Sequence, residues 1–505
     1  MFSNSLLKSY SLATIFVGAM TVGLSQAHAD KIVLLDPFAP EANWAMETDD
    51  AFALARAGCL ESLVRIDFDG KLQPSLATSW KQSSPTTWDF SIRQGVKFTD
   101  GQELNAAAVV NSLNRVLTAE TPSRTFNPKK VSKVEAIDAS TVQITTPAPS
   151  VVLPLRLASP NTGILSPASY NDGGTVDVIG ACTGPFAVTS YVPQQKLDLA
   201  RNESYWGGMP AVEEAEMRFI ADGNTRVTQL KSGEAHIATK VPLSAKAGLA
   251  KNKDLVVTSV EIPRTTGMYL NNKKAPFNNP LIRKAVQAAI DTTAIAASAY
   301  EGGAVAAIGP FGSNEPWAGP TTAITRDLDR AKALLAEAGV KEGELSISLR
   351  AYNSRPELVD VAQIIQAQLK EAGIAVAVII TDWAGMAPSF KGATYDMAMM
   401  SRGHQLDVAD PIGFLQADYT CDGGFNMSHV CNPEIDALLE NASSIVDNDT
   451  RFAIYKKVST WLQEEAITVF IVHNSETNAV RSNVKGFRTH PLGHYYVTKE
   501  LALGN

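Results

Sequence analysis

The chain has 505 residues, of which 45% are hydrophobic and 19% are charged, and its formal net charge is −8. This acidic balance disfavours a nucleic-acid-binding protein, because binding to phosphates needs a basic face. A chain of this length normally forms two or three domains, each large enough for its own hydrophobic core.

The N-terminus predicts an export signal that is later removed. Lys8 is the only charged residue before position 30, and a largely apolar run covers 12–24. Ala27 and Ala29 supply the small residues of a cleavage site, so we expect a signal peptide over 1–29. The alternative is a membrane anchor, which needs roughly 20 apolar residues, more than this run provides. Because no Cys stands at the cleavage point, we expect a free periplasmic protein without a lipid anchor.

Four cysteines, Cys59, Cys182, Cys421 and Cys431, lie in the exported part. An even number in an oxidising compartment predicts two disulfides. Cys421 and Cys431 flank a short, turn-rich segment that can close on itself, which leaves Cys182 as the default partner of Cys59. A metal site is disfavoured, because the chain has neither a C-x-x-C nor an H-E-x-x-H motif.

The first half of the chain mixes strands and helices, as α/β and α+β proteins do. An apolar helix is predicted over 51–63, directly after the acidic segment 46–50 (METDD). A strand over 89–96, a helix over 106–117 and a strand over 142–146 follow, from the spacing of their apolar residues.

Helix starts are easier to place in the second half. Asn279 is a typical N-cap, and Pro280 fits the first helical position that follows it. Asp327 is predicted to begin another helix, which Gly339 ends.

A βαβ unit comes next. Alternation predicts a strand over 345–349, a helix runs from Pro356 to Gly373, and the apolar run 374–380 predicts a strand buried on both faces. Ligands of open α/β sheets bind beyond the carboxyl ends of the strands. The candidates at these ends are Arg350, Tyr352, Arg355, Asp382 and Trp383.

A third strand over 395–400 leads to our first choice for ligand contact, the segment 402–411 (RGHQLDVADP). It carries Arg402, His404, Asp407 and Asp410. The alternative for Asp407 and Asp410 is that they only cap the turn or helix near Pro411.

The segments 74–80 (PSLATSW) and 88–101 (WDFSIRQGVKFTDG) resemble the signature of the family 5 extracellular solute-binding proteins, which serve ABC importers of peptides, nickel and opines. Further matches follow in the family's order: TGPF at 183–186, RN at 201–202, YWG at 205–207, YLN at 269–271, RKA at 283–285, YD at 395–396, DP at 410–411, VKGF at 484–487 and PLG at 491–493. The ordered set covers essentially the whole exported chain. The late cysteine pair and the C-terminal stretch resemble the dipeptide-binding members most.

The resemblance implies an α/β, two-lobed periplasmic binding protein fold of the cluster C type, with a hinge between the lobes. Lobe I would comprise 30–266 and 472–505, with an extra subdomain at about 71–179, and lobe II would comprise 267–471. The ligand would be enclosed between the lobes and delivered to permease subunits in the inner membrane. We expect a monomer without a cofactor and without enzymatic activity.

The resemblance also implies roles for single residues. Asp407 takes the position that binds a peptide's α-amino group, and Arg350 and Arg355 flank the position of an Arg that binds the peptide's carboxylate. Trp383 falls where the family often has a Trp lining the pocket, and the alternative is packing inside the lobe. Each Arg has a surface role as its alternative.

Lobe I would contribute the segment before the first helix, with Thr48 and Asp49 as ligand contacts. If the acidic residues Glu47, Asp49 and Asp50 face the cleft, the ligand carries extra positive charge or is a metal complex. If they only satisfy the start of the helix, whose dipole favours anions, they carry no information about the ligand.

Three functions follow, in order of preference. The first is a receptor for short peptides. The second is a receptor for nickel, a metal chelate or an opine-like molecule, to which His404, His473, His490 or His494 would add a ligand. The third is a secreted hydrolase, which is disfavoured because the chain has no G-x-S-x-G motif and no zinc-protease motif.

Overall fold

The computed structural model describes residues 31–171, 175–319, 323–353, 355–405 and 408–504. The predicted signal peptide over 1–29 therefore lies outside the described residues. No helix in these ranges has the length and apolar composition needed to cross a membrane.

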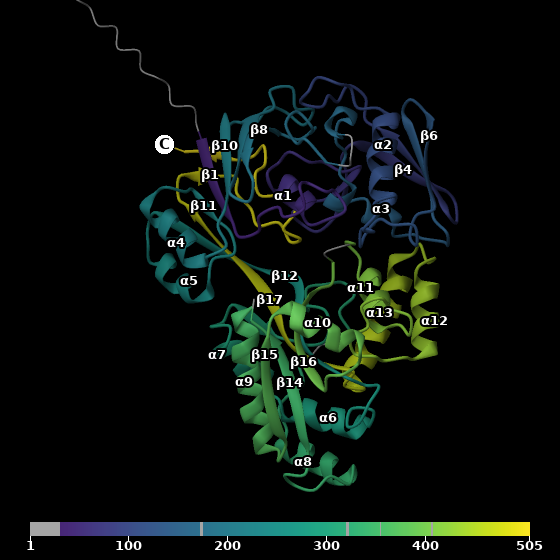
Figure 1. The fold of residues 1–505 in the computed structure, drawn as a ribbon, viewed down its shortest axis with the longest axis vertical. Helices are drawn as coiled ribbons and strands as arrows, with labels where there is room; N and C mark the ends of the chain where they lie inside the picture. The colour runs from purple at the N-terminus through teal and green to yellow at the C-terminus, as the bar shows by residue number, and fades with distance from the viewer. Residues whose placement is uncertain (1–30, 172–174, 320–322, 354, 406–407, 505) are drawn as a thin grey trace, which may run out of the picture.

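Two bodies are joined by a long antiparallel pair of strands, β12 (Leu255–Leu270) and β17 (Thr468–Arg481), which runs from one body into the other (Figure 1). Both strands belong to one large sheet with the order β15-β14-β16-β12-β17-β11-β1-β10-β9-β8. The upper body in Figure 1 holds the chain up to β12 and the chain after β17, and the lower body holds the chain between them.

The upper body, lobe I, contains β1 (Lys31–Asp36), β8 (Phe186–Val192), β9 (Lys196–Arg201), β10 (Glu214–Phe219), β11 (Ile237–Ala238), α1 (Asp50–Arg56), α4 (Gly223–Ser232) and α5 (Leu243–Ala250). Strands β1, β10 and β11 are parallel, so their carboxyl ends lie at one edge of the sheet. Two short pairs, β2 (Val64–Ile66) with β3 (Leu72–Pro74) and β18 (Val484–Lys485) with β19 (Ala502–Leu503), complete it.

A second sheet of lobe I has the order β4-β5-β7-β6 and packs with its own helix. It comprises β4 (Ala77–Ser84), β5 (Thr87–Ile92), β6 (Lys133–Asp138), β7 (Thr141–Thr145) and α2 (Ala106–Leu117), and is followed by α3 (Leu153–Arg156). The helix predicted over 106–117 is confirmed, because the Asn105 side chain accepts the Ala108 N–H and the buried face follows the predicted spacing.

The lower body, lobe II, contains β13 (Ala304–Ala306), β14 (Ser346–Tyr352), β15 (Ala375–Thr381), β16 (Met397–Gly403), α6 (Pro280–Ala289), α7 (Thr292–Ser298), α8 (Leu328–Glu337), α9 (Pro356–Glu371), α10 (Trp383–Lys391), α11 (Ile412–Tyr419), α12 (Pro433–Ala442) and α13 (Asn448–Glu464). The predicted helix starts are confirmed: the side chains of Asn279 and Asp327 accept the N–H groups of Leu281 and Arg330. The predicted βαβ unit is also confirmed, since β14 and β15 pair in parallel on either side of α9.

One prediction for this unit is wrong. The run 374–380 was expected to be buried on both faces, but β15 is the last strand of the sheet and pairs with β14 alone. Ile379 is 37% exposed and Ile380 is 50% exposed, while Ile374, just before the strand, is buried. An apolar run shows that a strand forms, but its position in the sheet decides how much of it is covered.

The helix predicted over 51–63 is also too long, since α1 ends at Arg56. Gly58 adopts a left-handed φ of +71°, which ends the helix, and a Cβ at this position would lie 2.3 Å from the Val497 carbonyl oxygen. The chain turns here so that Cys59 can reach Cys182.

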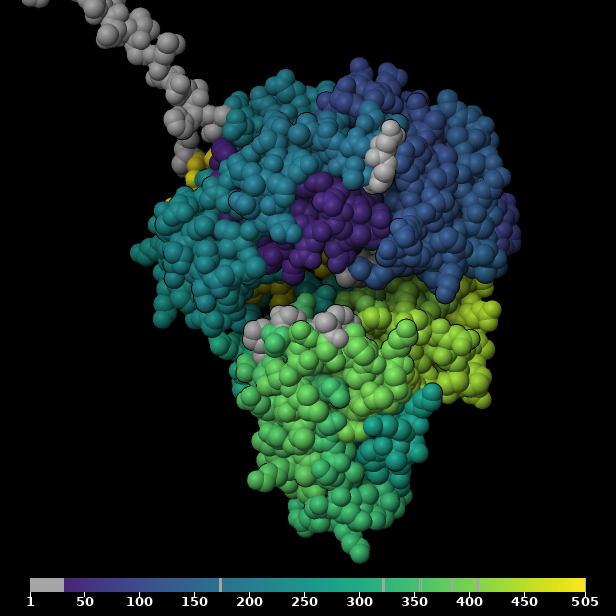
Figure 2. Space-filling model, viewed as in Figure 1, coloured from purple at the N-terminus to yellow at the C-terminus, as the bar shows by residue number. Residues whose placement is uncertain are grey.

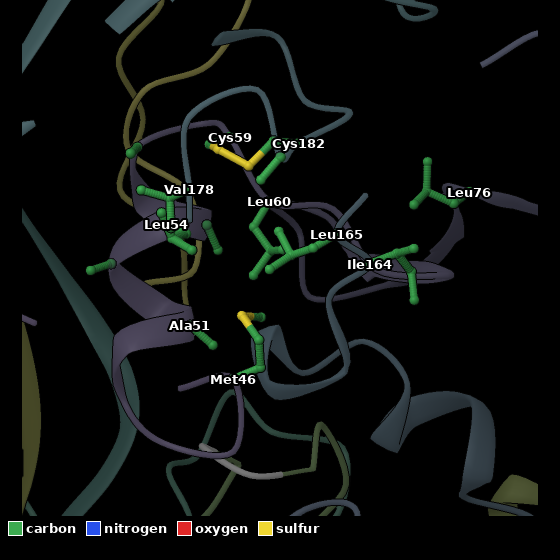
Figure 3. Close-up of a cluster of buried hydrophobic side chains, with 14 of the residues drawn as sticks. Met46, Ala51, Leu54, Cys59, Leu60, Leu76, Ile164, Leu165, Val178 and Cys182 are labelled. Carbon is green, nitrogen blue, oxygen red and sulfur yellow. A yellow bond between two sulfur atoms is a disulfide. The ribbon is translucent and has the colours of Figure 1, made fainter. Parts of the chain in front are cut away.

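Both predicted disulfides are present in the structure. Cys59 and Cys182 are bonded with their Cα atoms 5.2 Å apart, and Cys421 and Cys431 are bonded with theirs 4.3 Å apart. The first lies in the core of lobe I, among Leu54, Leu60, Leu165 and Val178 (Figure 3). A separate core fills lobe II on both sides of its strands, and a third lies beneath α11, α12 and α13.

Candidate functional site

A recess separates the two bodies (Figure 2). Its upper margin is formed by the purple segment near α1, and its lower margin by the green segment near α10 (Figures 1 and 2). Strand β14 pairs in parallel with both β15 and β16, so the carboxyl ends of all three strands lie at the same edge of the lobe II sheet. Helix α10 begins at this edge, directly after β15. This is the place where open α/β sheets bind ligands.

Positive charge collects at this edge. Arg264 on β12 lies opposite Gly403 at the end of β16, and its Nη1 donates to the Ser401 carbonyl at 2.8 Å. Burial and the charges of Arg355 and Arg402 lower the pKa of Arg264 to about 10. The three guanidinium groups are therefore close enough to repel one another.

The three cations differ in how they are neutralised. Arg402 forms two hydrogen bonds with Asp418. Arg355, at the N-cap position of α9, lies 3.4 Å from a Glu357 carboxylate oxygen. Within the described part of the chain, Arg264 has no carboxylate in ion-pair range. An anionic group of a ligand would balance this excess charge.

Arg350 lies two residues before the end of β14, beside Ile379 of β15 and Ala398 of β16. It is half-buried, and its Nε has no hydrogen-bond acceptor among the described residues. The guanidinium thus keeps unused donor capacity close to the same edge.

The residues after β15 begin α10. Asp382 is its N-cap, with a side chain that accepts the Gly385 N–H at 2.7 Å, so the carboxylate has a local structural role. Trp383 is the first residue of the helix, and its side chain lies outside the described residues.

The segment 402–411 has a fixed beginning and a fixed end. His404 is 3% exposed, and its Nε2 lies 2.9 Å from both carboxylate oxygens of Glu315. Asp410 is 1% exposed; it accepts the Ile412 N–H and the Tyr455 hydroxyl. The capping alternative for Asp410 therefore holds, while Asp407 lies outside the described residues.

In lobe I, the acidic residues before α1 are already engaged. The buried Asp50 carboxylate accepts three backbone N–H groups, those of Glu41, Ala42 and Trp44, at 2.8–2.9 Å. Asp50 therefore fixes its own loop and neither faces the cleft nor caps the helix with its side chain.

Its two neighbours in the chain differ. The Asp49 carboxylate is exposed and pairs with Arg124 at 2.7 Å. The Thr48 hydroxyl, half-buried, donates to the Ala45 carbonyl at 2.7 Å and accepts the Asp50 N–H at 3.2 Å. The capping hypothesis is therefore wrong for Asp49 and Asp50, because Asp49 makes no side-chain hydrogen bond to the helix and Asp50 binds its own loop. The Thr48 hydroxyl instead accepts the N–H of the first helical residue.

The carboxyl end of β1 holds a charged group that sequence reasoning missed. Arg56 lies 3.9 Å from Asp36, and Lys240, which follows β11, lies 3.1 Å from Glu476. The ring of Phe38, 49% exposed, lies 5.6 Å from the Arg56 guanidinium carbon and 5.4 Å from the Lys240 ammonium. Arg56 and Lys240 are each paired with a carboxylate, so their charges are balanced. The exposed Phe38 ring is therefore the group at this strand end that a ligand could contact.

The four histidines considered for a metal complex are buried, and two of them use both ring nitrogens for other hydrogen bonds. His473 binds Thr265 and the Ile308 N–H, and His490 binds the Ile66 carbonyl and the Leu492 N–H. His494 is 2% exposed and stacks on His490. Among the described residues, no three His, Cys, Asp or Glu side chains form a group that could hold a metal ion. A bound metal would have to bring most of its own ligands.

The sequence between positions 71 and 426 matches the family described as "Bacterial extracellular solute-binding proteins, family 5 Middle". The chain belongs to this family. Its members are the substrate-binding proteins of ABC importers rather than enzymes, and they bind small ligands or peptides and work with the permeases of those importers.

Relatives of known binding specificity align along most of the chain. The nickel-binding protein NikA of Staphylococcus aureus is 27% identical over 497 residues, covering 97% of this chain and 98% of that protein. The dipeptide-binding protein of Escherichia coli is 28% identical over 466 residues, covering 84% of this chain and 85% of that protein.

Solved structures show the same two-lobed α/β fold. S. aureus NikA in complex with Ni(L-His)2 superposes with a TM-score of 0.78 at 26% identity, covering 94% of this chain and 100% of that one. The binding protein AgaA from A. tumefaciens R10, in complex with agropinic acid, gives 0.77 at 25% identity, covering 94% of this chain and 99% of that one.

Arg264 and Phe38 are the site residues that sequence reasoning did not select. Arg264 stands two residues before the predicted lobe crossing at 266, and an Arg beside a hinge that faces a cleft is a signal that could have been used. No pattern in the sequence indicates Phe38, because the position of its ring depends on the packing of Arg56 and Lys240 around it.

Proposed function

We propose that this protein captures short peptides between its two lobes in the periplasm and delivers them to the permease of an ABC importer. The observation that carries the proposal is the excess positive charge at the strand ends of lobe II. Arg264 lacks a carboxylate partner among the described residues, and Arg355 lies beside it. The α-carboxylate of a peptide matches the fork of an Arg side chain.

The cationic end of the peptide requires a carboxylate. In this proposal Asp407 supplies it, because the residue occupies the family's amino-binding position, three residues before Asp410-Pro411. A buried ammonium without a partner would cost several kcal/mol, so the interaction would discriminate strongly for a free amino terminus. The exposed ring of Phe38 would contact apolar parts of the ligand from lobe I, near Thr48 and Asp49.

The lobes would close around the ligand by bending β12 and β17, with lobe I as 30–266 plus 472–505 and lobe II as 267–471. The register between β12 and β17 shifts between Glu261 and Thr265 and again between Thr266 and Gly267, close to the proposed boundary at 266. Irregular pairing weakens a ladder locally and makes this the easiest place to bend. The protein would act as a monomer, because each chain contains both lobes.

Calorimetry with matched peptides tests the proposal. A dipeptide with free ends should bind the wild-type protein, and its N-acetylated form should bind about a hundredfold or more weakly, as expected for a lost buried charge pair. In Asp407→Asn the two peptides should differ little. Asp422→Asn, an exposed residue of the same lobe, is the control. An N-acetylated peptide that binds wild type as well as the free peptide would contradict the role of Asp407.

The second candidate is a receptor for a metal chelate or an opine-like anion, which the relative NikA favours through its match along 97% of the chain. Arg264 and Arg355 would bind the carboxylates of such a ligand equally well. Native mass spectrometry and metal analysis of untagged protein from the periplasm distinguish the two. A stoichiometric transition metal in the purified protein would replace the peptide proposal.

A further inference from the structure

Glu315 is a half-buried carboxylate that lies outside the strand ends and contacts the start of the segment 404–410, which we call the ligand segment. It accepts hydrogen bonds from the Gly312 N–H at 2.8 Å, Trp317 Nε1 at 2.9 Å and Gln405 Nε2 at 2.8 Å, and it pairs with His404 Nε2 at 2.9 Å. Two of these partners belong to its own loop and two belong to the start of the ligand segment. The carboxylate thus joins two segments that are far apart in the sequence.

The same loop is bound to both strands that connect the lobes. The Thr265 hydroxyl of β12 donates to the Pro310 carbonyl at 2.8 Å, and His473 of β17 accepts the Ile308 N–H at 3.2 Å. Thr265 and His473 are cross-strand neighbours and bind each other at 3.0 Å. We call residues 307–317 the linking segment, because it contacts β12, β17 and the ligand segment.

His404 is held on its other sides as well. Its backbone N–H donates to the Pro263 carbonyl of β12 at 3.0 Å, and its ring lies edge-on to Phe311 at 5.0 Å between centroids. The far end of the ligand segment is held by Asp410 with Tyr455. His404 and Gln405 are therefore attached to β12 through Pro263 and to the linking segment through Glu315.

We infer that Glu315 is a positioning residue, which fixes the start of the ligand segment 404–410 and couples it to the two strands that bend when the lobes close. This inference rests on the proposed function only in placing the ligand at this segment. Glu315 itself would not touch the ligand. Its four contacts would set the position from which residues further along the segment meet it.

Four titratable groups face one another here: Glu261 of β12, Glu315 of the linking segment, His404 after β16 and His473 of β17. Burial disfavours the charged form of Glu315, but the charge and hydrogen bond of His404 and the bonds from Gly312 and Trp317 outweigh it, so the pKa of Glu315 is lowered. Burial lowers the pKa of His473 to about 4, so His473 is neutral and Glu315 stays ionised opposite His404.

Two substitutions test this coupling. Glu315→Gln places an amide N–H₂ among four hydrogen-bond donors and removes the charge, while Gln405→Leu removes one donor and leaves the carboxylate in place. Glu371→Gln, on the surface of lobe II, is the matched control, since its carboxylate pairs only with the partly exposed Arg326. Because Gln405→Leu is the milder change, it decides the question if Glu315→Gln does not fold.

Hydrogen exchange of the ligand-free protein gives the first readout. We expect amides in 404–410 to exchange about tenfold or more faster in both variants, whereas amides of β14 and β16 are unchanged. Wild-type exchange at 404–410 in a folded Gln405→Leu variant would overturn the inference. This result does not depend on peptide binding, so it separates the inference from the proposed function.

Ligand affinity gives the second readout. We expect about tenfold to hundredfold weaker binding of the dipeptide in Glu315→Gln, because the hydrogen bonds that hold His404 and Gln405 are lost. The double variant with Gln405→Leu should bind no more weakly than Glu315→Gln alone, since both act through one contact. Additive losses in the double variant would overturn the coupling.

Discussion

The guanidinium of Arg402 forms two hydrogen bonds with the carboxylate of Asp418, from Nε to Oδ2 at 3.0 Å and from Nη2 to Oδ1 at 2.8 Å. Asp418 is fully buried, whereas Arg402 lies at the end of β16 among the other arginines of the proposed site. This pair neutralises one of the three positive charges at this edge, whereas Arg264 has no carboxylate in ion-pair range among the described residues.

Asp418→Asn should lower the free energy of unfolding by about 3 kcal/mol, because it leaves a partly buried guanidinium without its counter-charge. Urea unfolding followed by circular dichroism measures the change. Asp422→Asn, exposed and four residues later in the chain, should leave the midpoint within error. Equal midpoints for the two variants would show that the pair contributes no net stability.

Arg264→Met should weaken binding of a dipeptide with free ends by about tenfold to hundredfold, because the ligand carboxylate loses a charged donor. The same peptide with an amidated C-terminus should bind wild type and Arg264→Met with similar, weak affinity. Arg488→Met serves as the control, since Arg488 is an exposed lobe I residue paired with Asp69. Calorimetry with both peptides is the measurement, and equal losses for both peptides would contradict a contact with the carboxylate.

The lobes also meet at Val152, away from β12 and β17. This side chain of lobe I is 2% exposed within the core beneath α11, α12 and α13, and the Val151 N–H donates to the Ser443 carbonyl at 3.0 Å. Figure 2 shows the blue and yellow-green surfaces in contact on this side. The two lobes are therefore in contact here in the arrangement that the structure shows.

Val152→Ser should therefore open the lobes and weaken ligand binding by roughly tenfold, because burying a Val contributes about 1.5–3 kcal/mol to the closed form only. Small-angle scattering should show a larger radius of gyration without ligand. Val446→Ser is a suitable control, since Val446 is 72% exposed on lobe II. An unchanged radius and affinity would mean that the contact persists in the open form.

The two disulfides should stabilise the protein unequally. In the chain-entropy model, the bond between Cys421 and Cys431, 10 residues apart, contributes about 3 kcal/mol, and the bond between Cys59 and Cys182, 123 residues apart, contributes about 5 kcal/mol. Replacing each pair by Ala and measuring the urea midpoint should give the larger loss for Cys59 and Cys182. The reverse order would show that packing around the loop 421–431 outweighs chain entropy.

Acid should destabilise the protein through His490. Burial lowers the pKa of this fully buried side chain from 6.5 to about 4, so the unfolded chain binds a proton between these pH values and the folded protein does not. The free energy of unfolding is therefore unaffected by this proton above pH 6.5 and decreases as the pH drops towards 4. The total decrease amounts to roughly 3 kcal/mol.

His490→Gln should accordingly show a flatter decline in stability between pH 6.5 and pH 4 than the wild type. Urea unfolding at half-unit pH steps provides the comparison. The decline would be unchanged in the variant if other groups, such as His473 with a pKa of about 4, dominate the acid response.

Features that depend on near neighbours in the chain were predictable from the sequence. Asn279 and Asp327 begin helices because each side chain binds an N–H group two or three residues later, and the alternation in β14 appears within seven residues. The ordered motifs predicted the fold, since they resemble the family's sequence from residue 74 to residue 493. The cysteine pairing followed from an even count and one short loop.

Features that depend on distant segments were decided only by the tertiary structure. The apolar run 374–380 is one continuous strand in sequence, yet the sheet order places it at an edge, where half of it meets solvent. Arg264 and Arg355 lie 91 positions apart and meet because β12 and β14 both flank β16 in one sheet.

The charges of the segment 402–411 show the same division. The sequence shows which charged residues this segment contains. It does not show which of these residues already bind another part of the protein. Glu315 engages His404, Asp418 engages Arg402, and Tyr455 engages Asp410, and each partner comes from another part of the chain. Local hydrogen bonding therefore determined the elements, whereas the pairing of buried charges, which needs atoms within a few ångströms in the folded molecule, determined the site.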